Sequence, residues 1–171
     1  LIIGGGISGI LCGYMLKAAG VDYVITEQNT ILSGVTQNTT AKITYHHGAI
    51  FDKMLKHFGK DTLELYLKAN KEALNDYRNI CENIDCDFKA TDFSESDSYV
   101  YSLNNPKKIE NEVKALNEAG IGAKFVTDLP LPIKVAGAVK VKNQAEFNPL
   151  KFLYTIAKEL NIYENTKVLE L

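Results

Sequence analysis

The sequence predicts an α/β fold that begins with a parallel βαβ unit and includes an inserted strand-rich, mixed α+β region. The apolar run 1–3 leads through a glycine-rich turn, residues 4–9, into an apolar helical stretch. A second apolar run, 23–25, ends at Glu27. This order of strand, glycine turn, helix, strand and acid is that of a Rossmann-like nucleotide-binding unit. Beyond residue 85 the pattern changes to short extended runs rich in aromatic residues, which is typical of strands and turns.

The glycine turn has the G-x-G-x-x-G spacing, and each glycine has a mechanical role. Gly4 permits the tight turn, Gly6 lets the backbone approach a pyrophosphate, and Gly9 lets the helix pack closely on the strand. The helix N-terminus offers N–H groups and a partial positive charge to phosphates. Glu27 is expected to accept hydrogen bonds from ribose hydroxyls, which favours FAD or NAD over NADP. The alternative is a glycine turn that only packs.

The middle of the chain is expected to be a long polar stretch followed by helices. Residues 28–45 are rich in Thr, Asn, Ser and Gly, and so long an irregular stretch in a compact fold is usually functional. Two helices are expected next, over 50–58 and 61–84, separated by Gly59.

Two further helices are expected in the second half of the chain. Asn105-Pro106 and Asn148-Pro149 each combine an N-cap residue with a proline in the first turn, which favours a helix start. The extended runs are expected to be strands, at 99–101, 123–126, 131–135, 138–141 and 167–171.

The composition and charge of the chain argue against a nucleic acid or a membrane as its partner. The chain has 19 basic and 21 acidic residues and a net charge of −2, so it has no basic field for a nucleic acid. No apolar run approaches the length of a membrane span. Three cysteines without C-x-x-C spacing indicate a reducing compartment, and we expect a cytoplasmic location. The chain begins with Leu rather than Met, so the natural N-terminus is expected to lie upstream.

Three segments together resemble the FAD-dependent D-amino-acid oxidase and glycine oxidase group (the DAO family). They are residues 4–9 with Glu27, residues 33–44 (SGVTQNTTAKIT), and residues 144–149 (QAEFNP) before a helix. The resemblance spans the whole chain and places it as the N-terminal portion of a longer enzyme. It implies FAD as the cofactor and oxidation of an amine or amino acid C–N bond by hydride transfer to the flavin. The resulting imine would be hydrolysed by water.

The resemblance also implies a division into domains. Residues 1–85 would form the first part of the FAD-binding domain and 86–145 part of the substrate domain. Residues 146–171 would return to the FAD-binding domain, which is incomplete in this chain. Without the rest of the enzyme, the isolated fragment is expected to be inactive.

The predicted cofactor-binding residues come from the first two segments. In the family, the second segment lies along the pyrophosphate and reaches the flavin ring, where a cation such as Lys42 would stabilise the anionic reduced form. The alternative interpretation of this second segment is a solvated loop. The predicted set is Gly4, Gly6, Ile7, Ser8, Gly9, Glu27, Gln28, Ser33, Gly34, Thr39, Thr40, Ala41, Lys42 and Ile43.

Catalytic residues are not identified by the sequence, and hydride transfer does not require a protein base. The pair His46-His47 has no nearby Cys or Asp, so no metal site is expected, and a packed or surface role is favoured over proton handling. Several aromatic residues could line a substrate pocket, although core packing is favoured: Phe88, Phe93, Tyr99 and Tyr101.

Two alternative functions stay open. An NAD-dependent dehydrogenase would use the same glycine turn, although the long polar stretch after Glu27 suits a cofactor that extends deeper into the protein. A non-catalytic flavin- or nucleotide-binding protein is the second alternative. The substrate's identity, the electron acceptor and the oligomeric state cannot be read from the sequence. Cys/His pairs for a Rieske iron–sulfur module, which some similar proteins carry, are absent from this chain.

Overall fold

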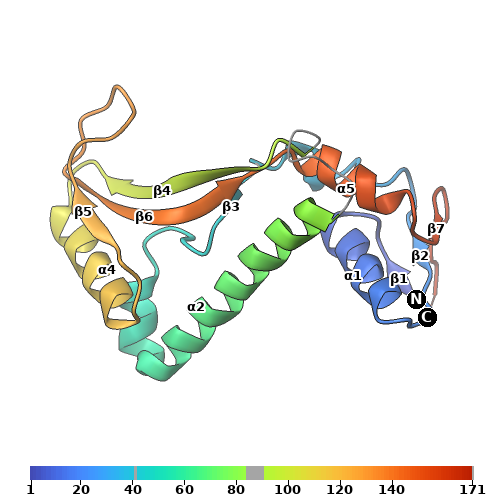
Figure 1. Cartoon of the computed structure of the whole chain (residues 1–171), viewed down its shortest axis with the longest axis horizontal. Helices are drawn as coiled ribbons and strands as arrows, with labels where there is room; N and C mark the ends of the chain where they lie inside the picture. Colours follow the sequence, from blue (N-terminus) through green and yellow to red (C-terminus); the bar gives the residue numbers. More distant parts are fainter. Residues whose placement is uncertain (41, 84–90, 171) are drawn as a thin grey trace. The chain divides into compact units, whose positions relative to one another are not determined.

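The computed structural model describes residues 1–40, 42–83 and 91–170, which form two compact units (Figure 1). The first unit takes its described residues from 1–41, 80–93 and 147–171. The second takes them from 42–79 and 94–146.

The first unit contains the predicted βαβ element. Strand β1 (Ile2–Ile3) leads into helix α1 (Ile7–Ala18) and then strand β2 (Ile25–Thr26). The strands are parallel, with Ile2 opposite Ile25, and α1 contacts both of them. Ile10 of α1 and Ile25 of β2 are fully buried, so this packing forms part of the unit's core. The α/β fold class is thereby confirmed.

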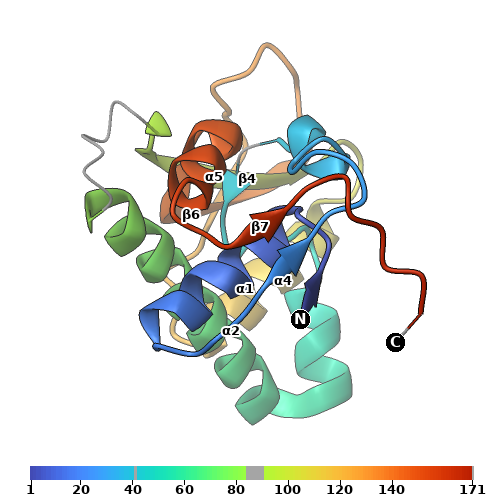
Figure 2. The same cartoon turned by 90° about the vertical axis from the view of Figure 1, so that its right-hand side faces the viewer.

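The third strand of this sheet lies elsewhere than the sequence predicts. Strand β7 (Ile162–Tyr163) pairs in parallel with β2, giving the order β1-β2-β7 (Figure 2). The prediction of a strand over 167–171 is wrong for residues 167–170, which have no regular structure, and residue 171 lies outside the described part. β7 has only two paired residues, one of them exposed, so it carries almost no local hydrophobic pattern.

Two smaller elements complete the first unit. The short 3-10 helix η1 (Val35–Asn38) and helix α5 (Pro149–Ala157) contact each other, and α5 also contacts α1. Helix α5 begins as predicted, since the Asn148 side chain accepts a hydrogen bond from the Lys151 N–H at 3.1 Å.

The second unit is an antiparallel sheet with helices. Its central strand is β6 (Gly137–Glu146), paired with β4 (Ser94–Ser102) on one side. On the other side it pairs with β3 (Lys42–Ile43) at one end and β5 (Lys124–Val126) at the other. This agrees with the predicted strand-rich region. The strand predicted over 131–135 is absent, because that segment has a proline at its second position and forms no ladder with β6.

Helices α2 and α4 belong largely to the second unit. Helix α2 (Phe51–Asn83) has left-handed, non-helical backbone at Gly59, where the sequence predicts the break between two helices. Helix α4 (Pro106–Glu118) begins with the Asn105 side chain accepting the Lys108 N–H at 3.0 Å, as predicted. None of the helices among the described residues is both long and apolar enough to cross a membrane.

The packing units and the predicted domain ranges differ mainly in the segment 42–79, and also at residues 91–93, which group with the first unit, and at residue 146, which groups with the second. Residues 42–79 group with the second unit, whereas the sequence assigns them to the first part of the FAD-binding domain, 1–85. Packing does not test which residues serve the cofactor, so the functional domain ranges stay a prediction.

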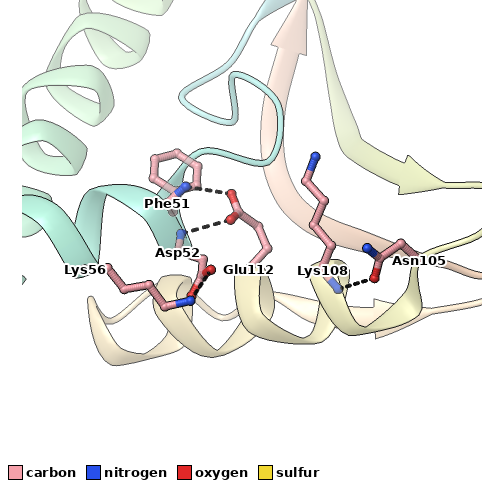
Figure 3. Close-up of polar contacts among 6 residues, drawn as sticks. All are labelled: Phe51, Asp52, Lys56, Asn105, Lys108 and Glu112. Carbon is pink, nitrogen blue, oxygen red and sulfur yellow. Dashed lines mark hydrogen bonds and ion pairs between the residues drawn. The ribbon is translucent and has the colours of Figure 1, made fainter.

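A buried carboxylate fixes the start of α2 in the second unit. Glu112 of α4 is 1% exposed and accepts hydrogen bonds from the backbone N–H groups of Phe51 (2.9 Å) and Asp52 (3.0 Å) (Figure 3). Burial raises the pKa of Glu112 above its ordinary value, while these N–H groups oppose the rise. The carboxylate therefore caps a helix that lies about sixty residues earlier in the chain.

Removing this cap is expected to destabilise the second unit. Glu112→Ala would leave two amide N–H groups without their acceptor and would open a small cavity, at a cost of about 2 kcal/mol in the free energy of unfolding. Urea unfolding of the full-length protein measures this. Glu110→Ala on the exposed side of the same helix is the control. Equal effects of the two substitutions would contradict the capping role.

Candidate nucleotide site and the loop that follows it

The glycine turn is built for close packing and for an approaching ligand. Gly4 has a φ of +106°, a conformation that favours glycine. A Cβ at Gly9 would overlap the carbonyl oxygen of Gly4, so only glycine lets α1 start this close to β1. Both features support the roles predicted for these glycines.

The N-terminus of α1 carries no side-chain cap of its own. Gly6 stands at the N-cap position, and the first turn has no acidic residue. Instead, the Ile7 N–H donates to Oγ1 of Thr36 at 3.2 Å, and the same oxygen lies 3.3 Å from where a Cβ of Gly6 would stand. The other N–H groups of this first turn have no intrahelical acceptor. The arrangement therefore suits an anion such as a phosphate.

Thr36 is a residue of this site that the predicted set lacks. It is buried in η1, and the preceding segment is tied to the turn because the Leu32 N–H donates to the Gly5 carbonyl at 3.0 Å. The predicted residues Ser33 and Gly34 lie between these two anchors. The only signal in the sequence for Thr36 was its position within the segment 33–44.

Glu27 stabilises the glycine turn through hydrogen bonds in this structure. Its carboxylate accepts hydrogen bonds from the N–H groups of Asn29 (2.9 Å) and Gly5 (2.8 Å). These two bonds lower the pKa of Glu27, the Asn29 bond most, so the group is ionised at neutral pH. Each carboxylate oxygen has a second lone pair, so ribose hydroxyls could still bind.

A pocket of about 280 Å³ opens at the carboxyl ends of β1 and β2. Parallel α/β sheets bind ligands at this end of their strands. The segment after β7 forms one side of the pocket, and it is held there because the Thr166 N–H donates to the Glu27 carbonyl at 2.8 Å. The lining residues are Ile3, Gly4, Thr26, Glu27, Gln28, Thr166, Lys167 and Val168. The last three were missed because their strand was misplaced.

The rest of the predicted set divides between the two units. Thr39 and Thr40 are exposed at the end of the first unit, whereas Lys42 and Ile43 form β3 of the second. Lys42 is exposed and Ile43 is buried. Ala41, also in the predicted set, lies outside the described residues.

The two adjacent histidines lie in different environments. His46 is 3% exposed, stacks on the Phe51 ring at 6.0 Å, and has no hydrogen-bond partner for either ring nitrogen among the described residues. Burial, with a smaller effect of His47, lowers the pKa of His46 to about 4. His47 is exposed, and its Nε2 lies 3.4 Å from Oδ1 of Asn70. These are a packed and a surface histidine.

A groove of about 750 Å³ runs along the sheet of the second unit. Its lining includes Tyr99 and Tyr101 of β4, Leu129 and Leu131 of the loop before β6, and Lys42 of β3. Of the other aromatic candidates, Phe93 is buried and Phe88 lies outside the described residues. No group of three or more His, Cys, Asp or Glu within the described ranges could hold a metal.

Comparison with known proteins identifies the family to which the chain is similar. The sequence model of the family described as FAD dependent oxidoreductase (DAO) matches residues 1–171. A putative Rieske 2Fe-2S iron–sulfur protein of Bacillus subtilis (strain 168) is 37% identical over 179 residues. That match covers 99% of this chain and 34% of the relative, so the chain spans about a third of the relative's length.

Solved structures share the fold at low sequence identity. L-proline dehydrogenase from P. horikoshii has a TM-score of 0.74 at 17% identity, over 98% of this chain and 44% of that one. Glycine oxidase from Geobacillus kaustophilus has a TM-score of 0.74 at 16% identity, over 98% and 46%. L-amino acid deaminase from Proteus vulgaris has a TM-score of 0.65 at 15% identity, over 96% and 39%.

Proposed function

The chain belongs to the FAD-dependent oxidoreductase family, and from this premise we propose that its protein oxidises an amine or amino acid at the C–N bond. FAD would accept the hydride from the carbon that bears the nitrogen, and water would hydrolyse the resulting imine. The observation that carries the dinucleotide part of the proposal is the overlap between a Cβ at Gly9 and the Gly4 oxygen, beside a helix N-terminus whose N-cap residue, Gly6, has no side chain to cap it.

The residues of the first unit have distinct proposed roles toward the dinucleotide. Gly6 and Ser8 would present backbone N–H groups to the pyrophosphate, next to Ile7, whose own N–H donates to Thr36 in this structure. Ser33 and Gly34 would flank the pyrophosphate. Glu27 and Gln28 would bind the adenosine end, in the pocket of about 280 Å³. Thr39, Thr40, Ala41, Lys42 and Ile43 would run toward the flavin ring.

The proposed substrate is a small amine or amino acid. The names of the structural neighbours, a proline dehydrogenase, a glycine oxidase and an amino acid deaminase, support this class. The groove of about 750 Å³ has the size of a small-molecule site. It combines apolar walls with one basic residue, Lys42, and three acidic residues, Glu95, Asp97 and Glu146. We propose that it contributes to substrate binding, and that the protein is cytoplasmic.

The visible absorption spectrum of the purified full-length protein tests the proposal. Flavin bands, with FAD identified by chromatography after heat release, are expected, followed by bleaching when amines or amino acids are added without oxygen. A colourless protein that takes up no FAD, or that binds NADH saturably, would overturn it. Bound FAD that no member of a broad amine panel reduces would favour a non-catalytic flavoprotein.

Glu27→Ala is expected to weaken FAD binding about tenfold, because the ribose loses an acceptor and the turn loses its tie to Gly5. Titration of the apoprotein with FAD measures the dissociation constant. Glu159→Ala, which removes an exposed acid paired with Lys17 in the same unit, is the matched control. Unchanged FAD affinity in Glu27→Ala would refute the role of this carboxylate.

A further inference from the structure

The edge of β6 is covered unevenly by strands. β3 pairs with residues 145–146 and β5 with residues 138–140 on the same side of β6. Between them, within the described part of the chain, residues 141–144 have no strand partner on this side. β3 is only two residues long, so its own ladder holds the following segment weakly.

The side chain of Gln144 occupies this gap. It is 2% exposed, and its Oε1 accepts hydrogen bonds from Oγ1 of Thr44 (2.8 Å) and the N–H of Tyr45 (3.1 Å). Its Nε2 donates to the carbonyl of Lys142 at 3.0 Å. One buried amide therefore joins the segment after β3 to the central strand of the sheet.

The hydrogen bonds form a connected series that leads from the backbone of His46 through Thr44 to Gln144. The N–H of His46 donates to Oγ1 of Thr44 at 2.9 Å, and that hydroxyl donates its own hydrogen to Gln144. Because Gln144 uses its oxygen for two donors and its nitrogen for one acceptor, the orientation of its amide is fixed. A carboxylate or an apolar side chain could not reproduce all three bonds.

A local irregularity of the sheet lies directly beside Gln144. The register between β4 and β6 shifts between Ser96 and Ser98, and Asn143 has a left-handed φ of 58°. Beyond this shift Gln144 and Ala145 pair in regular register with Ser96 and Glu95, and both are buried. Such bulges re-aim side chains and occur often beside functional sites.

From these contacts we infer that Gln144 is a positioning residue for the bound flavin, acting through the segment from Lys42 to Tyr45. This inference rests on the proposed function, in which Lys42 and Ile43 approach the flavin ring. Gln144 and Thr44 also line the groove of about 750 Å³ together with Lys42. Holding the backbone after β3 in place would position the backbone of Lys42, whose ammonium is proposed to tune the ring, and one wall of the groove.

The test compares Gln144→Leu with a matched loss elsewhere in the second unit of the full-length protein. Asn117 is the control, because its side-chain amide also bonds a backbone segment, at the N–H (2.9 Å) and carbonyl (3.1 Å) of Ala123. The readouts are the reduction potential and visible spectrum of the bound flavin, the FAD dissociation constant and the melting temperature. Thr44→Val, which removes the hydroxyl between the His46 N–H and Gln144, is the milder second variant.

Gln144→Leu is expected to lower the flavin's reduction potential, alter its spectrum and weaken FAD binding about tenfold. Thr44→Val should shift the same quantities less, and Asn117→Ala should lower only the melting temperature. If Gln144→Leu and Thr44→Val destabilise the protein but leave the flavin's potential, spectrum and affinity unchanged, the positioning role is overturned. A wild-type protein that binds no FAD overturns the proposed function as well as this inference.

Discussion

Gly9→Ala in the full-length protein is expected to abolish stable FAD retention. The new Cβ would overlap the carbonyl oxygen of Gly4, which is backbone and cannot move aside as a flexible side chain could. The start of α1 would have to shift away from β1, and with it the N–H groups that are proposed to bind the pyrophosphate. We expect at least a hundredfold loss of FAD affinity, which corresponds to roughly 3 kcal/mol. The ratio of flavin to protein after gel filtration, and FAD titration of the apoprotein, measure it.

Substitutions of two other glycines are the controls that distinguish a general loss of stability from damage to the FAD site. A Cβ at Gly13 would lie 2.6 Å from Cδ1 of Ile25, a side-chain atom, so Gly13→Ala should destabilise the helix–strand packing while leaving FAD binding less affected. A Cβ at Gly122 meets nothing within 4 Å, so Gly122→Ala should change neither property. Retention of FAD by Gly9→Ala at the wild-type level would refute the role of this glycine.

The features that the sequence predicts correctly are local ones. The βαβ order, the break at Gly59 and the caps at Asn105 and Asn148 depend on residues that lie close together in the chain, and all are present. Asn105 and Asn148 each accept a hydrogen bond from the N–H three residues further on, and Gly59 has the positive φ that glycine tolerates, so a single sequence contains the necessary information.

The features that the sequence misplaces depend on distant partners. β7 exists because Ile162 lies opposite Ile25 of β2. The Thr36 contact at the N-terminus of α1 spans 29 residues, and the bond from Thr44 to Gln144 spans 100. Nothing in the local pattern of one sequence selects such partners.

The candidate site shows the same division. The glycine turn and Glu27 follow from a motif with a known mechanical basis, and the structure brings them together. The part of the pocket lining formed by residues 166–168 could be recognised only once the third strand was placed beside β2. The predicted contacts of Thr39 to Ile43 with the flavin stay a prediction, because they concern segments in two separate units.

Acid is expected to destabilise the second unit through His46. Its pKa is lowered from 6.5 to about 4 in the folded protein, so the folded ring stays neutral at pH values where the unfolded chain binds a proton. Stability is therefore lost as the pH falls from about 6.5 to about 4, and no further loss from this group follows below that range. The full effect is about 3 kcal/mol. Urea unfolding at pH 7 and pH 4.5 measures it.

His46→Leu isolates this contribution from that of the carboxylates. Leucine has a similar volume, does not titrate and removes two buried nitrogens that have no partner among the described residues, so at pH 7 the variant should be at least as stable as the wild type. Between pH 7 and pH 4.5 it should lose less stability than the wild type, by about 2 kcal/mol. His57→Leu, at an exposed position on α2, is the control for replacing a histidine by leucine. If His46→Leu and the wild type lose the same stability, His46 is protonated within the folded protein without cost, and its burial does not hold the ring neutral.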